Sequence, residues 1–565
     1  MSRKKPVLWA MAVLVSLALV ASACGKSKKS TGGATGAGTN EKVKKGGTLR
    51  YAADQEPTGF NNDTSKDNGT SVVNVMIRVW PSAFFNDPKF NVVMDKELLD
   101  SAEVTSQDPE TIVYKINKNA KWSDGVDINA DDFEYNWKAQ SGDASLKDVD
   151  GKPYDVASTA GYEDIQSVTG SDNGKTVTVV FKKKYADWKA LFSQSIVPAH
   201  IAKTKGWNDG FDKFDPAVVV SGGPFKIQSY NLGKDLTLVP NDKYWGAKPH
   251  LDSIVFRFIS DSAQQVPALQ NNEVDMIYPQ PQLDLLNQVN AIQGVNHELT
   301  EGLSFEHLDF NFKNAFLKDP VVRKAFAKAL DRGAIVKATV GQLDPKAVVL
   351  NNRIYVNNQP EYEDTSGGQY DAADPNAAKT MLTGAGYKLG ADGIFTKNGK
   401  RLSLRLSTTA GNALREAQGL LIQAQEKAAG IDIKIDNSPS KVLFGTRLPG
   451  GDFDVANFAW VATPFASSNK SIYATVPAGQ HTQNYDSYSN PTVDSNMTAA
   501  TGELDAAKVK TDWNAIDKML WDDMVTIPLY QKPTYVAYRN TFANIHDNAS
   551  SNGPLWNAET FGLKG

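Results

Sequence analysis

The residue with the most distinctive chemistry is Cys24, because it is the only cysteine among the 565 residues. It follows the small residues Ala-Ser-Ala, which are preceded by an uncharged apolar stretch from Pro6 to Val20 and a cationic segment at residues 2–5. This order of cationic, apolar and small residues is typical of a secretory signal peptide. The apolar stretch is shorter than the ~20 residues of a membrane-spanning helix, so a membrane span is the weaker interpretation.

A lone thiol cannot form a disulfide within the chain. The position of Cys24 resembles a bacterial lipobox, in which the cysteine is lipidated and becomes the mature N-terminus. Ala21 stands where leucine is commonest in that motif, and ordinary signal cleavage that leaves an unmodified thiol stays open. Two or more acyl chains hold a protein firmly on a membrane. We therefore predict a lipoprotein signal peptide at residues 1–23 and a flexible Ser-, Thr-, Gly- and Lys-rich tether at residues 24–46.

No catalytic or metal-binding motif accompanies this thiol. The sequence has no P-loop, no G-x-S-x-G elbow and no H-E-x-x-H pair. Adjacent acids such as Asp131 and Asp132 are most simply solvated helix faces, although a distant pair of hydrolytic carboxylates stays open. We predict no metal, no cofactor and no enzyme activity. The histidines do not stand at metal-ligand spacing: His200, His250, His297, His307, His481 and His546.

The composition indicates a protein with an ample hydrophobic core. Aromatic residues make up 10% of the chain, and from Gly47 onward the chain is long enough for more than one lobe. The formal net charge is -4 and becomes more negative once the cationic residues 2–5 are removed. An acidic protein of this kind is not expected to bind nucleic acid.

Two different patterns predict the elements that position functional residues. The first part of the chain reads as a mixed α/β body. The pattern changes after about Phe305, where Asp319-Pro320 and Asp374-Pro375 predict helix starts. In the first part we expect strands at 110–116, 176–183, 253–259 and 274–278, a hairpin at 223–241, a helix at 261–273 and a helix capped by Asn129.

In the second part, strands alternate with helices, which predicts right-handed βαβ units and a parallel sheet. Trp460 ends the last of these strands, and ligands of open α/β sheets lie beyond the carboxyl ends of parallel strands. The tryptophan therefore suits a cleft wall, and a core position stays equally open. The expected strands are 402–408, 431–435 and 453–460, and the expected helices are 412–430 and 440–448.

Several stretches follow one another in a characteristic order along the chain: "GGTLRYA", "YKINKNAKWSDGVDINADDFEYNW", "SGGPFKI", "NDKYWGAKPHLDSIVFRFISDSAQQVPALQNNEVD", "NFKNAFLKDPVVRKAFAKALDRGAIV", "FDVANFAW" and "IPLY". Together they resemble the bacterial extracellular solute-binding proteins of family 5, the peptide- and nickel-binding class that serves ABC importers. The resemblance implies an α/β, two-lobed periplasmic-binding-protein-like fold, with the lobes joined by a hinge and the ligand enclosed between them. It implies lobe I at 47–80, 186–305 and 536–565, an extra subdomain of lobe I at 81–185, and lobe II at 306–535.

The resemblance also implies the residues that contact the ligand. In peptide-binding members the ligand backbone pairs with the chain that flanks the tryptophan, here Ala459 and Val461 around Trp460. Main-chain pairing is insensitive to the identity of side chains, so it suits a receptor for varied peptides. The opposing lobe would add Asp67 and Asn68.

The resemblance also implies a ligand contact from Tyr278. At one position, however, this chain differs from the pattern of the family. Peptide-binding members place an aspartate three residues after the tryptophan, where it pairs with the α-amino group of the ligand. This chain has Thr463 there. Either another acid, Asp67 first, supplies the charge, or the natural ligand has no free amine at that point.

The function implied is that of a lipid-anchored, extracytoplasmic substrate-binding protein of an ABC importer. It would capture peptides, act as a monomer, deliver its ligand to the permease subunits and lie on the outer face of the cell membrane. Within the same fold, an oligosaccharide, a metal chelate or haem stays open as the ligand. A secreted hydrolase is the alternative of a different class.

Overall fold

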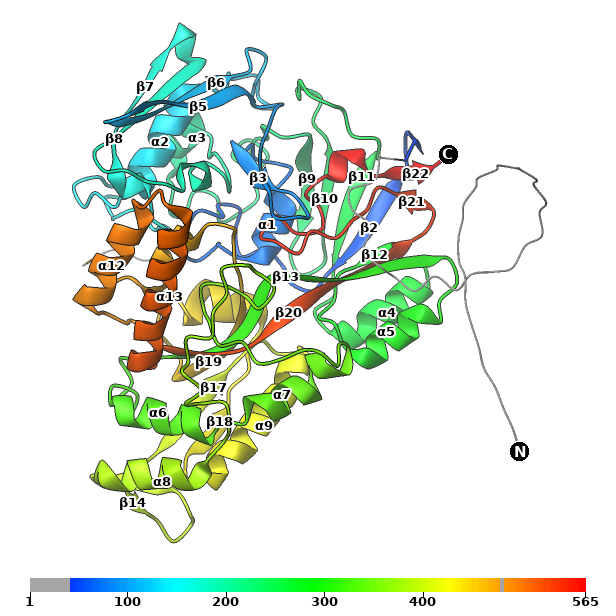
Figure 1. Ribbon diagram of the computed structural model, residues 1–565. Coiled ribbons are helices and arrows are strands. Elements are labelled where there is room, and N and C mark those ends of the chain that lie inside the picture. Colours follow the sequence, from blue (N-terminus) through cyan, green and yellow to red (C-terminus); the bar gives the residue numbers. More distant parts are fainter. Residues whose placement is uncertain (1–40, 478–481) are drawn as a thin grey trace, which may run out of the picture. The chain divides into compact units, whose positions relative to one another are not determined.

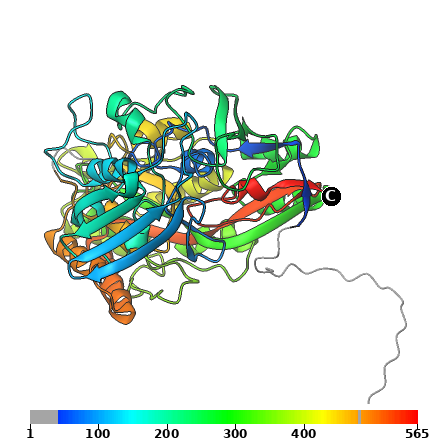
Figure 2. The same ribbon diagram turned by 90° about the horizontal axis from the view of Figure 1, so that it is seen from above.

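A sheet of ten strands runs through the part of the chain that the computed structural model describes, residues 41–477 and 482–565. Its strand order is β18-β17-β19-β13-β20-β12-β2-β11-β10-β9. The two long central strands, β13 (Val295–Phe310) and β20 (Thr526–Arg539), run side by side and antiparallel (Figure 1, Figure 2). The predicted signal peptide, Cys24 and most of the tether lie outside the described residues.

The register between β13 and β20 is interrupted twice, between Glu301 and Phe305 and between Glu306 and His307. Such irregularities bend a strand locally. Buried side chains form separate cores on the two sides of this point. One core draws on residues 49–276 and 536–561, and the other draws on residues 308–530.

The strands β13 and β20 therefore pass from one lobe to the other and join the two lobes, as the predicted fold requires. We call the first core and its elements lobe I and the second lobe II. The residue boundaries of the lobes and of the subdomain stay a prediction.

Lobe I holds the half of the sheet in which β11 and β12 run parallel to β2. The predicted hairpin at 223–241 is confirmed, because β9 and β10 pair antiparallel around a tight turn. The elements of this half are β2 (Thr48–Ala53), α1 (Thr70–Met76), β9 (Phe225–Asn231), β10 (Asp235–Pro240), β11 (Ser253–Phe258), α4 (Ser262–Gln270), β12 (Met276–Ile277) and α5 (Leu283–Asn290).

A separate antiparallel sheet, in the order β5-β6-β8-β7, lies within residues 81–185. The helix α2 (Ala130–Gln140) packs against it. The predicted cap of this helix is confirmed. The Asn129 side chain accepts a hydrogen bond from the Asp131 amide, and the Asp132 carboxylate accepts one from the Asn129 amide, which stabilises the first turn. The neighbouring elements are β3 (Phe84–Asn86), β4 (Val92–Met94), β5 (Leu99–Gln107), β6 (Glu110–Ile116), β7 (Ile165–Ser171), β8 (Thr176–Phe181) and α3 (Ala199–Lys205).

Lobe II contains the predicted βαβ units, since β17 (Ser403–Ser407) runs parallel to both β18 (Asp432–Ile435) and β19 (Val455–Val461). The prediction of a parallel sheet is wrong in one respect: β19 also pairs antiparallel with β13, so the sheet is mixed. The reason is that β13 enters from lobe I along the edge of β19 that faces away from β17. The helices are α6 (Pro320–Ala329), α7 (Arg332–Ala338), α8 (Pro375–Gly384), α9 (Ala413–Ala428), α10 (Ser440–Val442), α11 (Lys470–Tyr473), α12 (Pro491–Thr501) and α13 (Ala506–Asp523).

The C-terminal residues return to the core of lobe I, where Phe542, Leu555 and Phe561 are buried. Within the described ranges, none of the helices has the length and apolar character needed to cross a membrane. The remaining short strands are β1 (Val43–Lys44), β14 (Lys388–Leu389), β15 (Phe395–Lys397), β16 (Lys400–Arg401), β21 (Phe542–Ala543) and β22 (Gly562–Lys564).

Candidate ligand-binding site

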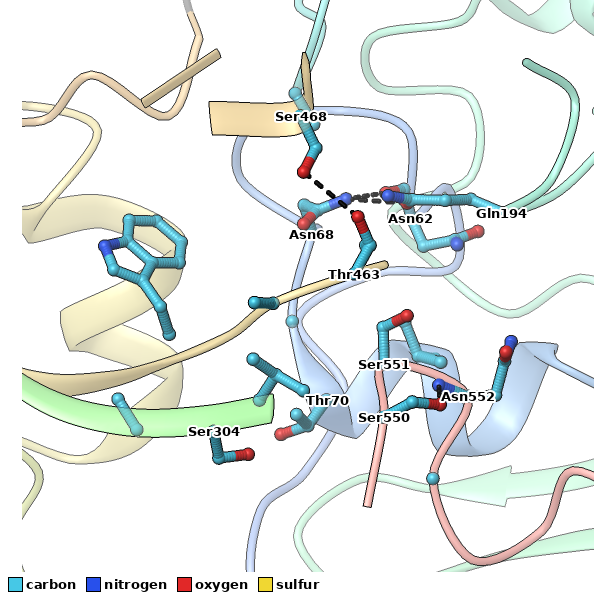
Figure 3. Close-up of a pocket in the computed structure, with 18 of the residues that line it drawn as sticks. Asn62, Asn68, Thr70, Gln194, Ser304, Thr463, Ser468, Ser550, Ser551 and Asn552 are labelled. Carbon is cyan, nitrogen blue, oxygen red and sulfur yellow. Dashed lines mark hydrogen bonds between the residues drawn. The ribbon is translucent and has the colours of Figure 1, made fainter. Parts of the chain in front are cut away.

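A cavity of about 310 Å³ is lined by segments of both lobes (Figure 3). Lobe I contributes the loop between β2 and α1, the loop after β12 and a segment near the C-terminus, and lobe II contributes the end of β19 and the loop after it. Hydroxyl and amide side chains dominate the polar part of the lining. Those labelled in Figure 3 are Asn62, Asn68, Thr70, Gln194, Ser304, Thr463, Ser468, Ser550, Ser551 and Asn552.

Trp460 forms an aromatic wall of this cavity, at the end of β19. Its ring is stacked with the ring of Tyr485, with the centroids 6.0 Å apart, and with the buried ring of His307, at 5.8 Å. Phe458 packs edge-on against it at 5.1 Å. Trp460 is half-buried, so it serves the packing of lobe II and faces the cavity at once.

The main chain of β19 offers a free edge beside Trp460. Toward β13, the Ala462 amide donates to the Leu303 carbonyl at 3.2 Å, and backbone groups of an antiparallel ladder alternate in direction. Ala459 and Val461 therefore direct their amides and carbonyls away from β13. On that side β17 pairs with β19 only at Val455 and Ala456. Among the described residues, the edge at Ala459 and Val461 has no partner strand, and both residues line the cavity.

Thr463 lies in the cavity wall, at the start of the loop after β19. Its Oγ1 lies 3.0 Å from Ser468 Oγ and accepts a hydrogen bond from the Phe465 amide at 3.2 Å (Figure 3). The hydroxyl thus holds the loop in a turn. It presents no charge to the cavity.

Asn68 and Tyr278 line the cavity, and Asp67 does not. Asn68 Nδ2 donates to the Asn62 carbonyl at 2.7 Å and to Gln194 Oε1 at 2.9 Å. Tyr278 Oη donates to Asp547 Oδ1 at 3.0 Å.

The prediction that Asp67 contacts the ligand disagrees with its place in the structure. The residue is 2% exposed, and the loop before α1 folds over its carboxylate so closely that Gly59 has no room for a side chain. Burial raises the pKa of Asp67 to about 7. Asp67 is therefore a buried residue of the loop rather than a charge that faces the ligand.

A cluster of charges that the sequence did not reveal borders the cavity where β13 and β20 pass from one lobe to the other. Glu306 is fully buried and accepts hydrogen bonds from Arg415 Nη2 at 3.0 Å and Lys532 Nζ at 2.9 Å. Lys532 also donates to Gln280 Oε1 at 2.6 Å. We call Asp54, Gln280, Glu306, Arg415 and Lys532 the Glu306 cluster. All of them except Glu306 line the cavity.

The charges within the Glu306 cluster compensate one another. Burial alone would raise the pKa of Glu306, but the charges of Arg415 and Lys532 outweigh it and lower the pKa to about 2. Burial lowers the pKa of Lys532 despite the nearby Glu306, and burial raises the pKa of Asp54 despite the nearby cations. The five members are far apart in the sequence and carry no local motif, so no pattern in the sequence signals the cluster.

Direct contacts also join the lobes outside the cluster. Tyr185 Oη lies 2.8 Å from Ser467 Oγ, and Lys470 forms an ion pair with Glu163. Further contacts are the Ala186 amide to the Thr501 carbonyl at 3.0 Å, the Ser467 amide to Asp187 Oδ2 at 3.3 Å, Gln483 Nε2 to Asn68 Oδ1 at 2.8 Å, and Tyr485 Oη to the Ser65 carbonyl at 3.2 Å. We call this set the lobe–lobe contacts.

The histidines that the structure describes are scattered in space as well as in sequence. Within residues 41–477 and 482–565, no group of His, Cys, Asp and Glu side chains is arranged to hold a metal ion. His307 is buried and stacked with Trp460, while His200 Nε2 lies 2.8 Å from Asp124 Oδ2 and His546 Nδ1 lies 3.3 Å from Glu298 Oε1. His481 lies outside the described residues.

The comparison with known proteins gives a consistent result over most of the chain. The oligopeptide-binding protein OppA of Mycobacterium bovis is 31% identical over 508 residues, which are 88% of this chain and 82% of that protein. The structure of a periplasmic EDTA-binding protein, EppA, has a TM-score of 0.81 and 29% identity, and it covers 94% of this chain and 100% of its own. The structure of the oligopeptide-binding protein AppA from Bacillus subtilis in complex with a nonapeptide has a TM-score of 0.82 and 25% identity, with coverage of 92% and 100%.

The family assignment rests on a match that includes the end of β19 and the loop after it. Residues 94–480 match the model of the bacterial extracellular solute-binding proteins, family 5. Members of this family are solute-binding components of transport systems rather than enzymes. The chain belongs to the family 5 bacterial extracellular solute-binding proteins.

Proposed function

We propose that this protein captures peptides outside the cytoplasm and delivers them to the permease subunits of an ABC importer. The observation that carries the proposal is the free edge of β19 at Ala459 and Val461, which faces a cavity shared by two lobes. An extended peptide can add to such an edge as a further strand. The similarity to OppA and to AppA with its nonapeptide supports this reading.

The cavity is suited to ligands whose side chains vary. Main-chain hydrogen bonds to Ala459 and Val461 would hold any peptide in register, and the hydroxyl and amide lining can adapt to different side chains. Asn68, Trp460, Thr463 and Tyr278 complete the proposed contacts. Closure of the lobes around the ligand would follow from contacts that exist only in the closed arrangement.

A second candidate ligand is a neutral oligosaccharide. The stacked rings of Trp460 and Tyr485 and the many amides and hydroxyls of the lining favour it. A metal chelate has weaker support from the cavity itself, although the similarity to the EDTA-binding protein keeps it among the outcomes of the test.

The experiment that separates these ligands is native mass spectrometry of the purified protein. The mass that co-purifies should correspond to a peptide and yield amino acids on hydrolysis. A sugar or a metal chelate in its place would contradict the proposal.

We further propose that a lipid on Cys24 anchors the protein to the outer face of the cell membrane. The support is the order of cationic, apolar and small residues before the sole cysteine. Cys24→Ser should release the protein from the membrane fraction into the periplasm or the medium, as measured by fractionation and immunoblotting. Retention of the variant in the membrane fraction would contradict the anchor.

A further inference from the structure

We propose that the cavity has no charged anchor for either end of a peptide, so that a peptide blocked at both termini binds at least as tightly as the free form. This inference rests on the proposed function as a peptide-binding protein. It concerns the chemistry of the natural ligand: the enclosed part is uncharged at its ends, as in an N-blocked and C-blocked peptide.

Among the described residues, few of the side chains that line the cavity are charged. The charged lining residues are Asp54, Asp63, Lys66, Arg415 and Lys532. Side chains with amides, hydroxyls or aromatic rings are much more numerous in the lining. A free ammonium or carboxylate that enters an enclosed site needs a counter-charge to replace its hydration. The question is therefore whether any of these charges is available to a ligand.

The cations of the Glu306 cluster are already engaged. Arg415 directs Nε and Nη2 at Glu306 and Nη1 at Thr409 Oγ1 at 3.1 Å, so each of its nitrogens has a partner. Lys532 donates to Glu306 and Gln280. The Asp54 carboxylate interacts with the Gln280 side chain and with the charges of Lys532 and Arg415, so two cations and two carboxylates compensate one another. The cluster offers no surplus positive charge to a ligand carboxylate.

The remaining two charges are also accounted for. Lys66 binds Asp209 at 2.7 Å and Asp212 at 2.8 Å. Asp63 is 5% exposed and accepts a hydrogen bond from Ser195 Oγ at 2.7 Å. Burial raises the pKa of Asp63 to about 7, so the protein stabilises its neutral form. Neither residue presents a permanent free charge to the ligand.

The structure thereby decides between the two alternatives that the sequence left open at Thr463. Asp67 cannot supply a charge for a ligand amine, because it lies outside the lining and is buried. Thr463 itself offers a hydroxyl that already interacts with Ser468 and Phe465. The alternative that stands is a ligand without a free amine at this point.

The test is calorimetric titration of the full chain with four forms of one uncharged-side-chain pentapeptide: free, N-acetylated, C-amidated and blocked at both ends. We expect the doubly blocked form to bind at least as tightly as the free form. Weakening of tenfold or more on blocking either end would overturn this inference while leaving peptide capture intact. Failure of all four forms to bind would overturn both the inference and the proposed function.

Two pairs of variants make the test specific. Thr463→Asp should create a preference of at least tenfold for the free amine, because it places an unpaired carboxylate in the cavity wall, whereas the neutral Thr463→Asn should not. Asp63→Asn should leave the ratio of blocked to free affinity unchanged. If wild type prefers the free amine and Asp63→Asn abolishes that preference, Asp63 is the anchor and the proposal is wrong.

Discussion

The Glu306 cluster and the lobe–lobe contacts connect the same two lobes in different ways. Glu306 and Lys532, at the centre of the cluster, are buried and lie on β13 and β20, strands that are continuous from one lobe to the other. The lobe–lobe contacts join segments such as those of Glu163 and Lys470, which no strand connects. A rotation of the lobes would change the cluster little and would break the contacts. The cluster should therefore govern stability, and the contacts should govern the balance between open and closed forms.

The largest expected effect belongs to the cluster. Glu306→Gln would leave Arg415 and Lys532 buried with only Asp54 as a counter-charge, and removing one partner of a buried charge pair costs about 3–5 kcal/mol of unfolding free energy. Urea denaturation monitored by circular dichroism measures it. Glu301→Gln, an exposed change on the same strand, should stay within about 0.5 kcal/mol of wild type. Equal stability of the two variants would show that the cluster does not stabilise the pairing of β13 and β20.

Glu426 is a second buried carboxylate, and it contrasts with Glu306 because no cation among the described residues compensates its charge. Both carboxylate oxygens of Glu426, on α9, are buried without a hydrogen bond, and burial raises its pKa well above the usual value. Its neutral form favours folding, so stability is full below pH ~4.5 and falls above it, by up to about 1.4 kcal/mol per pH unit until Glu426 ionises in the fold.

Glu426→Gln should therefore remove that loss and raise stability at pH 7. Glu306 has the opposite sign: its lowered pKa makes its contribution present above pH ~4.5 and lost as the pH falls toward 2. Thermal unfolding of Glu426→Gln and Glu306→Gln, measured from pH 3 to pH 8, compares the two variants. A Glu426→Gln variant with an unchanged pH profile would mean that this carboxylate is hydrated.

The smallest expected effect belongs to the lobe–lobe contacts. Lys470→Ala removes a partly exposed ion pair, worth about 0.5–1 kcal/mol, so the affinity should weaken about two- to fivefold. Because neither Lys470 nor Glu163 lines the cavity, the factor should be the same for every ligand. Lys518→Ala, which removes an exposed ion pair within α13, is the control and should leave the affinity unchanged. A factor that differs between ligands would place Lys470 in the binding site.

The sequence predicted those features whose signals are local. The Asn129 cap, the hairpin at 223–241 and the proline-marked starts of α6 and α8 each depend on residues a few positions apart. The position of Trp460 at a strand end left a cleft wall and a core position equally open, and in the structure Trp460 lines the cavity and also packs in lobe II. The resemblance to the family supplied the two lobes.

The Glu306 cluster and the burial of Asp67 were beyond such reasoning. The cluster brings together residues from 54 to 532, and only the folded sheet makes them neighbours. Asp67 stands next to Asn68 in the sequence, but the turn before α1 directs one side chain into the cavity and covers the other. The antiparallel pairing of β19 with β13 was missed for a similar reason, since the two strands are far apart in the chain.

The central claim is that a peptide ligand pairs with the free edge of β19, and one measurement tests it most directly. Val461→Pro removes an amide that points away from β13, so it should spare the sheet and deprive the ligand of a hydrogen bond. We predict that calorimetry with the doubly blocked pentapeptide shows at least tenfold weaker binding to Val461→Pro and near wild-type binding to Val461→Ala, with both variants unfolding at similar temperatures. Equal affinity of the proline and alanine variants would contradict strand pairing at this edge.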